Sequence, residues 1–380
     1  MHFLHLFSAH KEAGKPLTTK GQQFGCTKKL LRKSIIDTDK FSNNIRNVSI
    51  QLVIHILAAL LAVCILVLAI VLELLLGDPS PNNPRKTTYK LHPTVLMGKL
   101  TRILETKLKN SNPRIEKIGG IVLALIIITV FTLPVYFGLF LIYTWLGLLF
   151  YALAAIILLK LTICIKLETD WAKAAAKALE AEDLTEAKKY SHFSRRDSKD
   201  LTCPQIASAV IESMAENLID FKLSPILSYT FLGVSGAIAF RAINTLDGMV
   251  GFKDGKHLHI GWFSANLDTV VNYIPARFTA LLIVLASAIL GEDYRNAWAI
   301  ARRDHAKTPS RNHGWPMAAM AGALCVQLEK PDQYILGEQS DQLTPNKIMV
   351  ALRIRNTAVI LCILLTLPLI ILIRLFFFPY

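Results

Sequence analysis

The chain has 380 residues, of which 53% are hydrophobic and 18% charged, and its formal net charge is +14. Soluble domains carry about 25% charged residues, so this composition, with a mean hydropathy of +0.41, indicates that lipid is one of the solvents. The positive excess fits anionic headgroups or an anionic substrate. Nucleic acid is not expected as a partner, because the sequence has neither a zinc-finger spacing nor an aromatic RNA-binding signature.

Residues 1–49 form a polar, basic segment with nine Lys or Arg and three Asp or Glu. The segment shows no sustained apolar period, so we expect an extension that is largely disordered or bound to a surface. A cleavable signal peptide is not expected, because the apolar sequence begins only near Ile50 and is too long for one. The six cysteines show no C-x-x-C spacing, which argues against a disulfide framework and a zinc site.

Four apolar runs are long enough to cross a bilayer, namely 50–72, 119–139, 141–165 and 357–373. Two shorter runs, 225–240 and 278–291, fall below the ~20 residues of a crossing helix. Tilted spans, re-entrant hairpins and buried helices all fit them, and incomplete crossings are preferred because these let the flanking segments meet. The expected fold is all-α and polytopic, with residues 50–380 as a single membrane-embedded domain. The positive-inside rule does not orient it, because the tail and the 77–118 segment have equal charge counts.

Polar residues gather between these runs, in segments 77–118, 166–224, 241–277 and 292–356. The Ala-rich stretch from Glu168 to Tyr190, with its alternating charges, is typical of a solvated helix. No repeat of 20–50 residues is present, which excludes solenoid architectures.

Three carboxylates, Glu212, Glu216 and Asp220, are spaced i, i+4, i+8 along a predicted helix. Like charges at this spacing destabilise a helix by roughly 0.2–0.5 kcal/mol per pair. A bound cation or a substrate ammonium would remove that repulsion. A merely solvated acidic face is the alternative, although Ser213, Asn217 and the apolar run that follows place this face beside the membrane-embedded core.

A second polar group, Arg241, Asn244 and Asp247, follows directly on an apolar run. The spacing i, i+3, i+6 directs all three side chains to nearly one side of a helix. Burial of such a trio without a partner is unfavourable, which indicates a ligand. An ion pair between Arg241 and Asp247 at the end of a helix is the plainer alternative.

The remaining polar groups are more scattered. Asp268 and Asn272 form an i, i+4 pair, and Pro275 is predicted to break the helix just before Arg277, which alone would more often reach the membrane interface than bind phosphate. Farther along, Arg303, His305 and Asn312 lie among turn formers and suit anion binding. His92, before a proline, fits a substrate contact or a turn. No P-loop, G-x-S-x-G or H-E-x-x-H motif is present.

Taken in order, these segments resemble the adenosylcobinamide-phosphate synthase (cobinamide synthase) family of cobalamin biosynthesis. The resemblance covers about residues 60–330. The matching strings are Leu75-Leu-Gly-Asp-Pro79, His92-Pro-Thr-Val-Leu-Met-Gly98, Arg196-Asp-Ser198, Glu212-Ser-Met-Ala-Glu-Asn217, Arg241-Ala-Ile-Asn-Thr-Leu-Asp247 with Met249-Val-Gly251, Asn272-Tyr-Ile-Pro-Ala-Arg277, and Asn312 with Gly314-Trp-Pro316 and Ala321-Gly-Ala-Leu324. Three positions depart from the family pattern: Phe221 replaces a Gly, His313 a small residue, and Met317 a frequent Glu.

The resemblance implies a membrane-bound ligase that forms an amide bond. It would join 1-aminopropan-2-ol, or its O-phosphate, to the f carboxylate of (adenosyl)cobyric acid with cleavage of ATP, giving (adenosyl)cobinamide or its phosphate. The corrinoid would be a substrate rather than a cofactor. Condensation of a carboxylate with an amine in water needs an activated acyl group, and an acyl phosphate made from ATP requires a divalent cation and basic residues. We therefore expect ATP and Mg²⁺.

Roles for the residues follow from this chemistry. The expected catalytic residues are Glu212, Glu216, Asp220, Asp247 and His305. The expected magnesium ligands are Glu212, Glu216 and Asp247, with Asp268 as a further candidate for the metal or the substrate ammonium. Phosphate is expected at Arg241, Arg277, Arg303 and Lys253, and the corrin amides at Asn217, Asn244, Asn272 and Asn312. His92 and Asp268 complete the expected substrate contacts.

Two other function classes compete with the ligase. A transporter of a corrinoid or organic anion should place ionisable residues near the middle of its spans, whereas here the long apolar runs are nearly free of them. A scaffold without chemistry leaves the acidic helix face unexplained. The enzyme is therefore favoured, as a multi-pass protein of the cell membrane that associates with other membrane-bound enzymes of cobalamin assembly.

Overall fold

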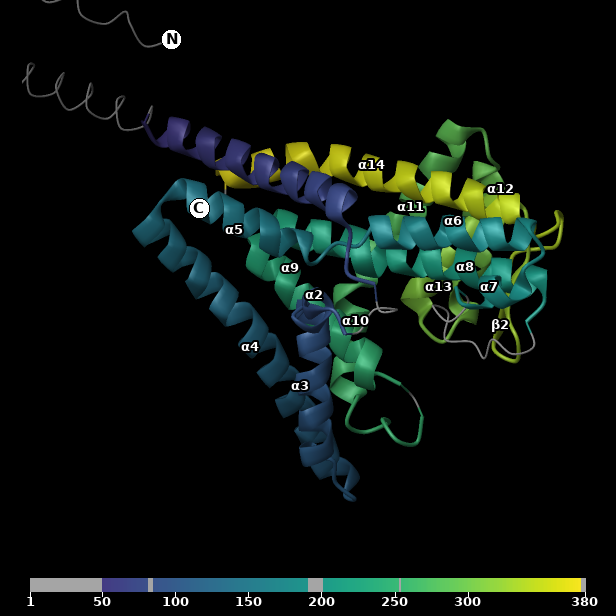
Figure 1. The fold of residues 1–380 in the computed structure, drawn as a ribbon, viewed down its shortest axis with the longest axis horizontal. Coiled ribbons are helices and arrows are strands. Elements are labelled where there is room, and N and C mark those ends of the chain that lie inside the picture. The colour runs from purple at the N-terminus through teal and green to yellow at the C-terminus, as the bar shows by residue number, and fades with distance from the viewer. Residues whose placement is uncertain (1–49, 81–84, 191–200, 253, 377–380) are drawn as a thin grey trace, which may run out of the picture. The chain divides into compact units, whose positions relative to one another are not determined.

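The structure is a computed structural model that describes residues 50–80, 85–190, 201–252 and 254–376 (Figure 1). The basic segment 1–49, the string 196–198 and Lys253, for which the sequence makes predictions, lie outside the described residues. The chain divides into two units, Met1–Ile56 and Leu57–Tyr380. Residues 50–56 are the described part of the first unit and are helical.

Helices make up nearly all of the described chain. After the apolar helix Ile50–Leu76, the elements are α2 (Thr87–Lys90), α3 (Pro93–Leu108), α4 (Pro113–Leu146), α5 (Leu148–Lys160), α6 (Lys166–Glu180), α7 (Leu184–Lys188), α8 (Cys203–Leu218), η2 (Ile219–Leu223), α9 (Ser224–Val250), α10 (Trp262–Val271), α11 (Tyr273–Leu290), α12 (Tyr294–Asp304), η3 (His305–Lys307), α13 (Arg311–Leu324), β1 (Leu328–Lys330), β2 (Tyr334–Leu336) and α14 (Pro345–Phe376). Strands β1 and β2 form an antiparallel hairpin, with Leu328 opposite Leu336. The predicted all-α class is confirmed.

Five helical stretches are long and apolar enough to cross a membrane: Ile50–Leu76, Pro113–Leu146, Cys203–Val250, Tyr273–Leu290 and Pro345–Phe376. The protein is therefore a polytopic α-helical membrane protein. Large apolar side chains on α4 and α5 face outward, among them Trp145 at 81% exposure. Lipid would cover such side chains, as expected for a membrane protein.

Two of the sequence predictions about the spans do not agree with the structure. The run 141–165 is not one span, because Gly147, with a φ of 85°, ends α4 and begins α5, which has only 13 residues. The preference for incomplete crossings at 225–240 and 278–291 is not supported, because these runs belong to the helical stretches Cys203–Val250 and Tyr273–Leu290, both long and apolar enough to cross a membrane. Helix α9 continues through Arg241 and Asn244. A helix is longer than its apolar run when it continues through buried polar residues, so the length of the run underestimates the length of the helix.

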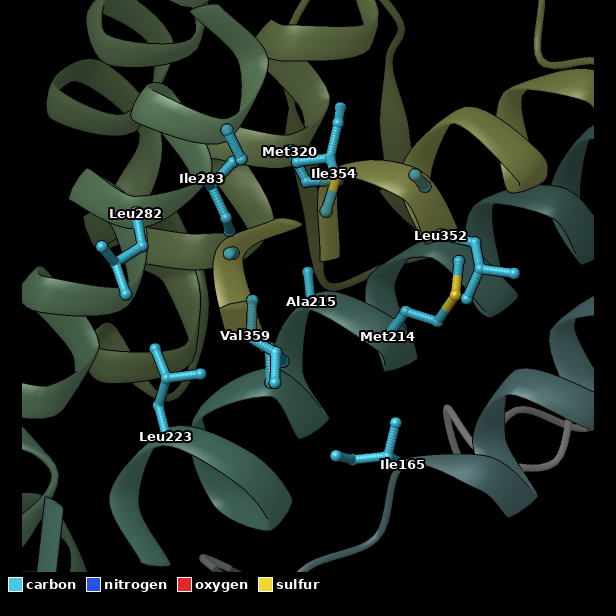
Figure 2. Close-up of a cluster of buried hydrophobic side chains, with 14 of the residues drawn as sticks. Ile165, Met214, Ala215, Leu223, Leu282, Ile283, Met320, Leu352, Ile354 and Val359 are labelled. Carbon is cyan, nitrogen blue, oxygen red and sulfur yellow. The ribbon is translucent and has the colours of Figure 1, made fainter. Parts of the chain in front are cut away.

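The helices pack in two groups that meet along α9. Helix α14 packs against α6, α8 and α11, and α13 packs against α8, α11 and α12. Figure 2 shows the core of this group, where Met214 of α8, Ile283 of α11 and Ile354 of α14 converge. Helices α3, α4 and α10 pack against α9 around a smaller apolar cluster. In Figure 1 helices α3 and α4 of this second group lie in the lower part of the picture, away from α14, α6 and α8.

Helix α6 corrects the prediction of a solvated helix over 168–190. Glu168 is buried, and Ala172, Ala175 and Ala176 pack into the main core, so only one face of the helix meets solvent. The Ala-rich composition reflects close packing against α14 and α8. The second half of the stretch is the short helix α7.

Glycine permits two local features of the frame. Gly233 interrupts α9 with a φ of 69°, a left-handed conformation that side chains disfavour, and so marks a kink. Gly120 of α4 lies directly on the segment before α10, where an added Cβ would fall 2.0 Å from the carbonyl oxygen of Ile260. This contact fixes α10, which carries the predicted site residue Asp268 and is followed directly by Asn272.

Candidate functional site

A π-helical turn, η2, joins α8 to α9 and carries Asp220, Phe221 and Lys222. Such turns insert an extra residue into a helix and are frequent at functional sites. Here the turn presents the Asp220 carboxylate to α10 and α13, while the carbonyl oxygen of Phe221 accepts a hydrogen bond from the Cys164 amide at 2.9 Å. The turn is therefore held from two sides.

His313 of α13 bridges two of the predicted carboxylates. Its Nδ1 lies 3.2 Å from Glu216 Oε1, and its Nε2 lies 3.2 Å from Asp220 Oδ1. A neutral imidazole carries only one N–H, so this arrangement favours the doubly protonated ring. Burial opposes the charge, but the carboxylates of Asp220, Glu216 and Asp268 outweigh it and raise the pKa of His313 well above its usual value. His313 is thus a cation enclosed by acids.

Asn272 connects Asp220 to α10. It occupies the break between α10 and α11, is fully buried, and donates to Asp268 Oδ1 at 3.1 Å and more weakly to Asp220 Oδ1 at 3.5 Å. Its carbonyl oxygen accepts from the Ser224 hydroxyl at 2.7 Å. The helix thus breaks at Asn272, and the predicted break at Pro275 is wrong. Pro275 lies within the first turn of α11, where its missing N–H is tolerated.

Asp268 has an unusual ionisation. Its burial, together with the nearby charges of Asp220 and Asp247, raises its pKa to about 7, although His313 acts in the opposite direction. A carboxyl group that titrates near neutral pH is suited to exchange a proton during a reaction. Asp247, the other acid near it, packs closely against Gly251, where a Cβ would meet its Oδ1 at 2.0 Å.

Arg241 is buried on α9 and incompletely satisfied. Its Nη1 makes two long hydrogen bonds of 3.4 Å, to the Asp220 carbonyl oxygen and to Asn244 Oδ1. Its guanidinium carbon lies 4.1 Å from the centre of the Phe221 ring, so the residue that departs from the family pattern supplies a cation–π contact. The Nε atom has no hydrogen-bond partner among the described residues. The predicted placement of Arg241 and Asn244 on one face is confirmed.

A cavity of about 220 Å³ adjoins Arg241. Its lining includes Asp78, His92, Thr94, Asn217, Phe221 and Arg241. The Asn217 amide donates to the Ser213 hydroxyl at 3.2 Å. Two residues predicted as substrate contacts, His92 and Asn217, therefore line the same space as Arg241.

An ionic network that the sequence analysis missed supports the cavity wall. Lys160 Nζ lies 2.8 Å from Glu73 Oε2, and 2.6 Å from both Asp78 Oδ1 and the Gly77 carbonyl oxygen. Lys160 and Glu73 interrupt strongly apolar runs, and an ionisable residue in such a run is the signal that would have identified them.

The same network contains a group of three potential metal ligands, Glu73, Asp78 and Cys164. The Lys160 ammonium already provides the positive charge there. Burial raises the pKa of the Cys164 thiol far above its usual range, so the thiol stays protonated and is a poor metal ligand. A lysine-centred network describes this group better than a metal site.

Arg277 and Asn312 form a neighbouring group at the beginnings of α11 and α13. Arg277 Nη1 donates to Asn312 Oδ1 at 3.3 Å, and the Asn312 amide donates to the Thr269 carbonyl oxygen at 2.8 Å. The guanidinium lies over the Tyr273 ring, and the predicted catalytic His305 stacks on Trp315 at 4.0 Å. His305 Nδ1 contacts backbone carbonyl oxygens. Its role as a general base remains a prediction.

Two predicted site residues are engaged elsewhere. Glu212 is buried and accepts hydrogen bonds from the Ser208 hydroxyl at 2.5 Å and the Tyr334 hydroxyl at 2.7 Å, next to the β hairpin. Arg303 pairs with Asp304 and Glu338. Glu212 and Glu216 thus have separate partners, although the sequence places both on one acidic face.

The position of the acids also removes one argument made from the sequence. Glu216, Asp220, Arg241 and Asp247 lie on the helical stretch Cys203–Val250, which is long and apolar enough to be a span. They are therefore not loop residues, and a transporter is not disfavoured on that ground.

The comparisons with known proteins agree on one family. The model of the family described as "CobD/Cbib protein" matches residues 66–360. A Methanothermobacter thermautotrophicus protein named "Probable cobalamin biosynthesis protein CobD" is 40% identical over 79% of this chain and 95% of its own length. A Dehalococcoides mccartyi protein named "Cobalamin biosynthesis protein CobD" is 36% identical over 77% and 92%, and one from Thermoplasma acidophilum is 32% identical over 78% and 93%. No solved structure matches the chain.

Proposed function

Because the chain belongs to the CobD/Cbib family, we propose that it acts in cobalamin biosynthesis as an ATP-dependent ligase that forms an amide bond. Its substrates would be the f carboxylate of (adenosyl)cobyric acid and the amine of 1-aminopropan-2-ol or its O-phosphate. The observation that carries the proposal is the extent of the family match, because residues 66–360 include every member of the polar cluster and the cavity.

The polar cluster supports chemistry at a carboxylate. His313 balances part of the charge of Glu216 and Asp220, and Asp268 can take up or release a proton near pH 7. Arg277, held over Tyr273 and bonded to Asn312, is a cation suited to a phosphate or carboxylate group. These groups come from α8, η2, α10, α11 and α13, so they are distant in the sequence and meet only in the folded chain.

The donor set can be tested against the magnesium ion that ATP requires. Mg²⁺ prefers hard oxygen ligands, commonly one or two carboxylates besides phosphate oxygens. Asp268 and Asp247 meet this requirement, since each is a carboxylate whose charge acts on the other. Glu212, bonded to Ser208 and Tyr334, fits less well. A bound ion would neutralise developing charge on the phosphates.

A corrinoid or organic-anion transporter is the second candidate. The observation that favours it is the placement of Asp220, Arg241 and Asp247 on a candidate span, where transporters keep functional ionisable residues. Activity in detergent separates the two, because transport has no meaning without a closed bilayer.

The test is product formation by purified protein in detergent with cobyric acid, the amine and Mg²⁺-ATP, followed by mass spectrometry. We expect a product with the mass of the amide, formed with one ATP cleaved per bond. Asp247→Asn and Glu216→Gln should reduce the rate by at least tenfold, whereas the exposed control Asp170→Asn should not. Folded wild-type protein that makes no amide would contradict the proposal. We further propose that the protein resides in the cell membrane and associates there with other cobalamin-assembly enzymes.

A further inference from the structure

Two residues that line one cavity each carry a buried nitrogen atom whose hydrogen bonding is incomplete. His92 and Arg241 are 6% and 8% exposed, and both line the cavity beside the π-helical turn. Arg241 Nε has no hydrogen-bond partner among the described residues, and the nearest polar partner of His92 Nε2 is Asp78 Oδ1, 3.5 Å away. An unsatisfied buried polar group is unfavourable by about 1–3 kcal/mol, and native proteins keep few of them. The arrangement therefore indicates a ligand that supplies polar atoms to both.

The size of the cavity limits that ligand. Its volume is about 220 Å³. Pockets for drug-sized molecules measure about 300–1,000 Å³. The cavity can therefore enclose a molecule of a few non-hydrogen atoms, whereas most of a corrin would lie outside it.

The wall of the cavity carries both a negative and a positive charge. Asp78 is a carboxylate 3.5 Å from His92 Nε2, and Arg241 is a buried cation. A cation on the ligand would be attracted to Asp78, and an anionic or oxygen-bearing group to Arg241. A short amine with an oxygen or phosphate at its other end has this pattern.

His92 is arranged to accept a proton. Its Nδ1 lies 2.8 Å from the Thr94 hydroxyl oxygen, and if Nδ1 carries the hydrogen, Nε2 keeps a lone pair that can take a proton. Once protonated, Nε2 can donate to Asp78. Burial opposes ionisation of Asp78, but the hydrogen bond to His92 and the charge of Lys160 outweigh it and hold the pKa of Asp78 below its usual value. Lys160 bonds to Asp78, Glu73 and the Gly77 carbonyl oxygen, and so fixes the position of that carboxylate.

We propose that this cavity binds the small amine co-substrate and that His92, oriented by Asp78 and Lys160, takes the proton from its ammonium group. The proposal rests on the proposed function. His92 is the catalytic residue, Asp78 and Lys160 are positioning residues, and Arg241 binds the far end of the amine.

The proton balance requires such an acceptor. The amine enters as an ammonium with three N–H bonds and leaves as an amide with one. Its nitrogen forms a bond to the carbonyl carbon of the acyl phosphate, and the bond from that carbon to the phosphate oxygen breaks with its electron pair on phosphate. One proton leaves on the phosphate, and the other passes through His92 to water.

The first test concerns His92. Replacement His92→Gln should lower kcat for amide formation by at least 100-fold, as expected for loss of a general base, with little change in the KM for ATP. Added imidazole should restore part of the rate, and the acidic limb of the pH profile should disappear. The other titratable groups at the cavity or in its supporting network are Asp78, Glu73, Tyr89, Lys160, Cys164, Glu168 and Arg241. The control His259→Gln, on the segment between α9 and α10, should leave kcat, the KM for ATP and the pH profile unchanged.

The second test measures binding without turnover. Calorimetry in detergent would use 1-aminopropan-2-ol and its O-phosphate as probes. Arg241→Gln and the charge-conserving Arg241→Lys should weaken binding of the phosphate at least tenfold and of the free amino alcohol much less. Asp78→Asn should weaken both. Equal effects of Arg241→Gln on the two probes would identify the free amino alcohol as the ligand, whereas no binding by wild-type protein would overturn the proposal.

The two hypotheses fail in different ways. Amide formation with an unchanged amine KM in Arg241→Gln and an unchanged kcat in His92→Gln would refute the cavity assignment and leave the ligase standing. Amine binding that depends on Arg241, in a folded protein that makes no amide, would refute the ligase and leave the amine site standing.

Discussion

Removal of His313 should reveal how much the site depends on a buried cation. The side chains of His313 and Asp220 are 9% and 11% exposed, so His313→Gln leaves the Asp220 charge buried without its nearest cation. Loss of one partner of a buried pair destabilises a protein by about 3–5 kcal/mol. We expect about 3 kcal/mol, because Glu216 is 39% exposed and water can replace its contact.

The informative comparison adds Asp220→Asn to His313→Gln. If the loss comes from an uncompensated carboxylate, the second substitution removes that charge and the double variant is more stable than His313→Gln alone. The assay is reversible unfolding by sodium dodecyl sulfate in mixed micelles, with free energies compared in a double-mutant cycle. Destabilisations that add, so that the double variant is the least stable, would refute the account of His313 as a counter-ion.

Three further expectations concern stability. Burial raises the pKa of Asp304, but Arg303, Lys307 and the Gly337 amide outweigh it and lower the pKa to about 2. Asp304 therefore stabilises the fold above about pH 4 and loses this effect as the pH falls through 2. In thermal melts Asp304→Asn should be about 1–2 kcal/mol less stable than wild type at pH 7, less than the full shift because Arg303 and Lys307 are about half exposed, and equal to wild type near pH 2. Gly120→Ala should destabilise by several kcal/mol, because the added Cβ meets the carbonyl oxygen of Ile260. Gly138→Ala, whose Cβ meets nothing within 4 Å, should instead stabilise by about 0.5–1 kcal/mol. Equal melting temperatures of the two variants would contradict this. Arg355→Met should alter stability by less than about 1 kcal/mol, because Glu168 keeps Lys222 at hydrogen-bond distance. Glu168→Gln should destabilise by about 3–5 kcal/mol, because it leaves Lys222 buried without its carboxylate. The reverse order in the same unfolding assay would show that Arg355 is the essential partner of Glu168.

Local spacing predicted much of the candidate site. The pair Asp268 and Asn272 and the pair Arg241 and Asn244 are hydrogen-bonded as their helical spacing predicts, because contacts at i, i+3 and i, i+4 depend only on helix geometry. The family resemblance brought together segments that spacing alone cannot connect. The all-α class followed from the apolar runs for the same local reason.

The failures concern contacts between distant segments. His313 was noted only as a departure from a family pattern, yet it lies between Glu216 and Asp220, which are almost 100 residues away in sequence. Lys160 and Glu73 satisfy each other across helices, which no periodicity reveals. Helix lengths were underestimated because polar residues inside α9 are paired within the protein, so the helix continues where the apolar run ends.

The fate of one oxygen atom tests the ligase most directly. Cobyric acid labelled with ¹⁸O in its free carboxylate would be converted by wild-type protein with ATP and the amine. Activation as an acyl phosphate predicts one labelled oxygen in inorganic phosphate for each amide formed. Label that appears in AMP, or in water alone, would contradict it.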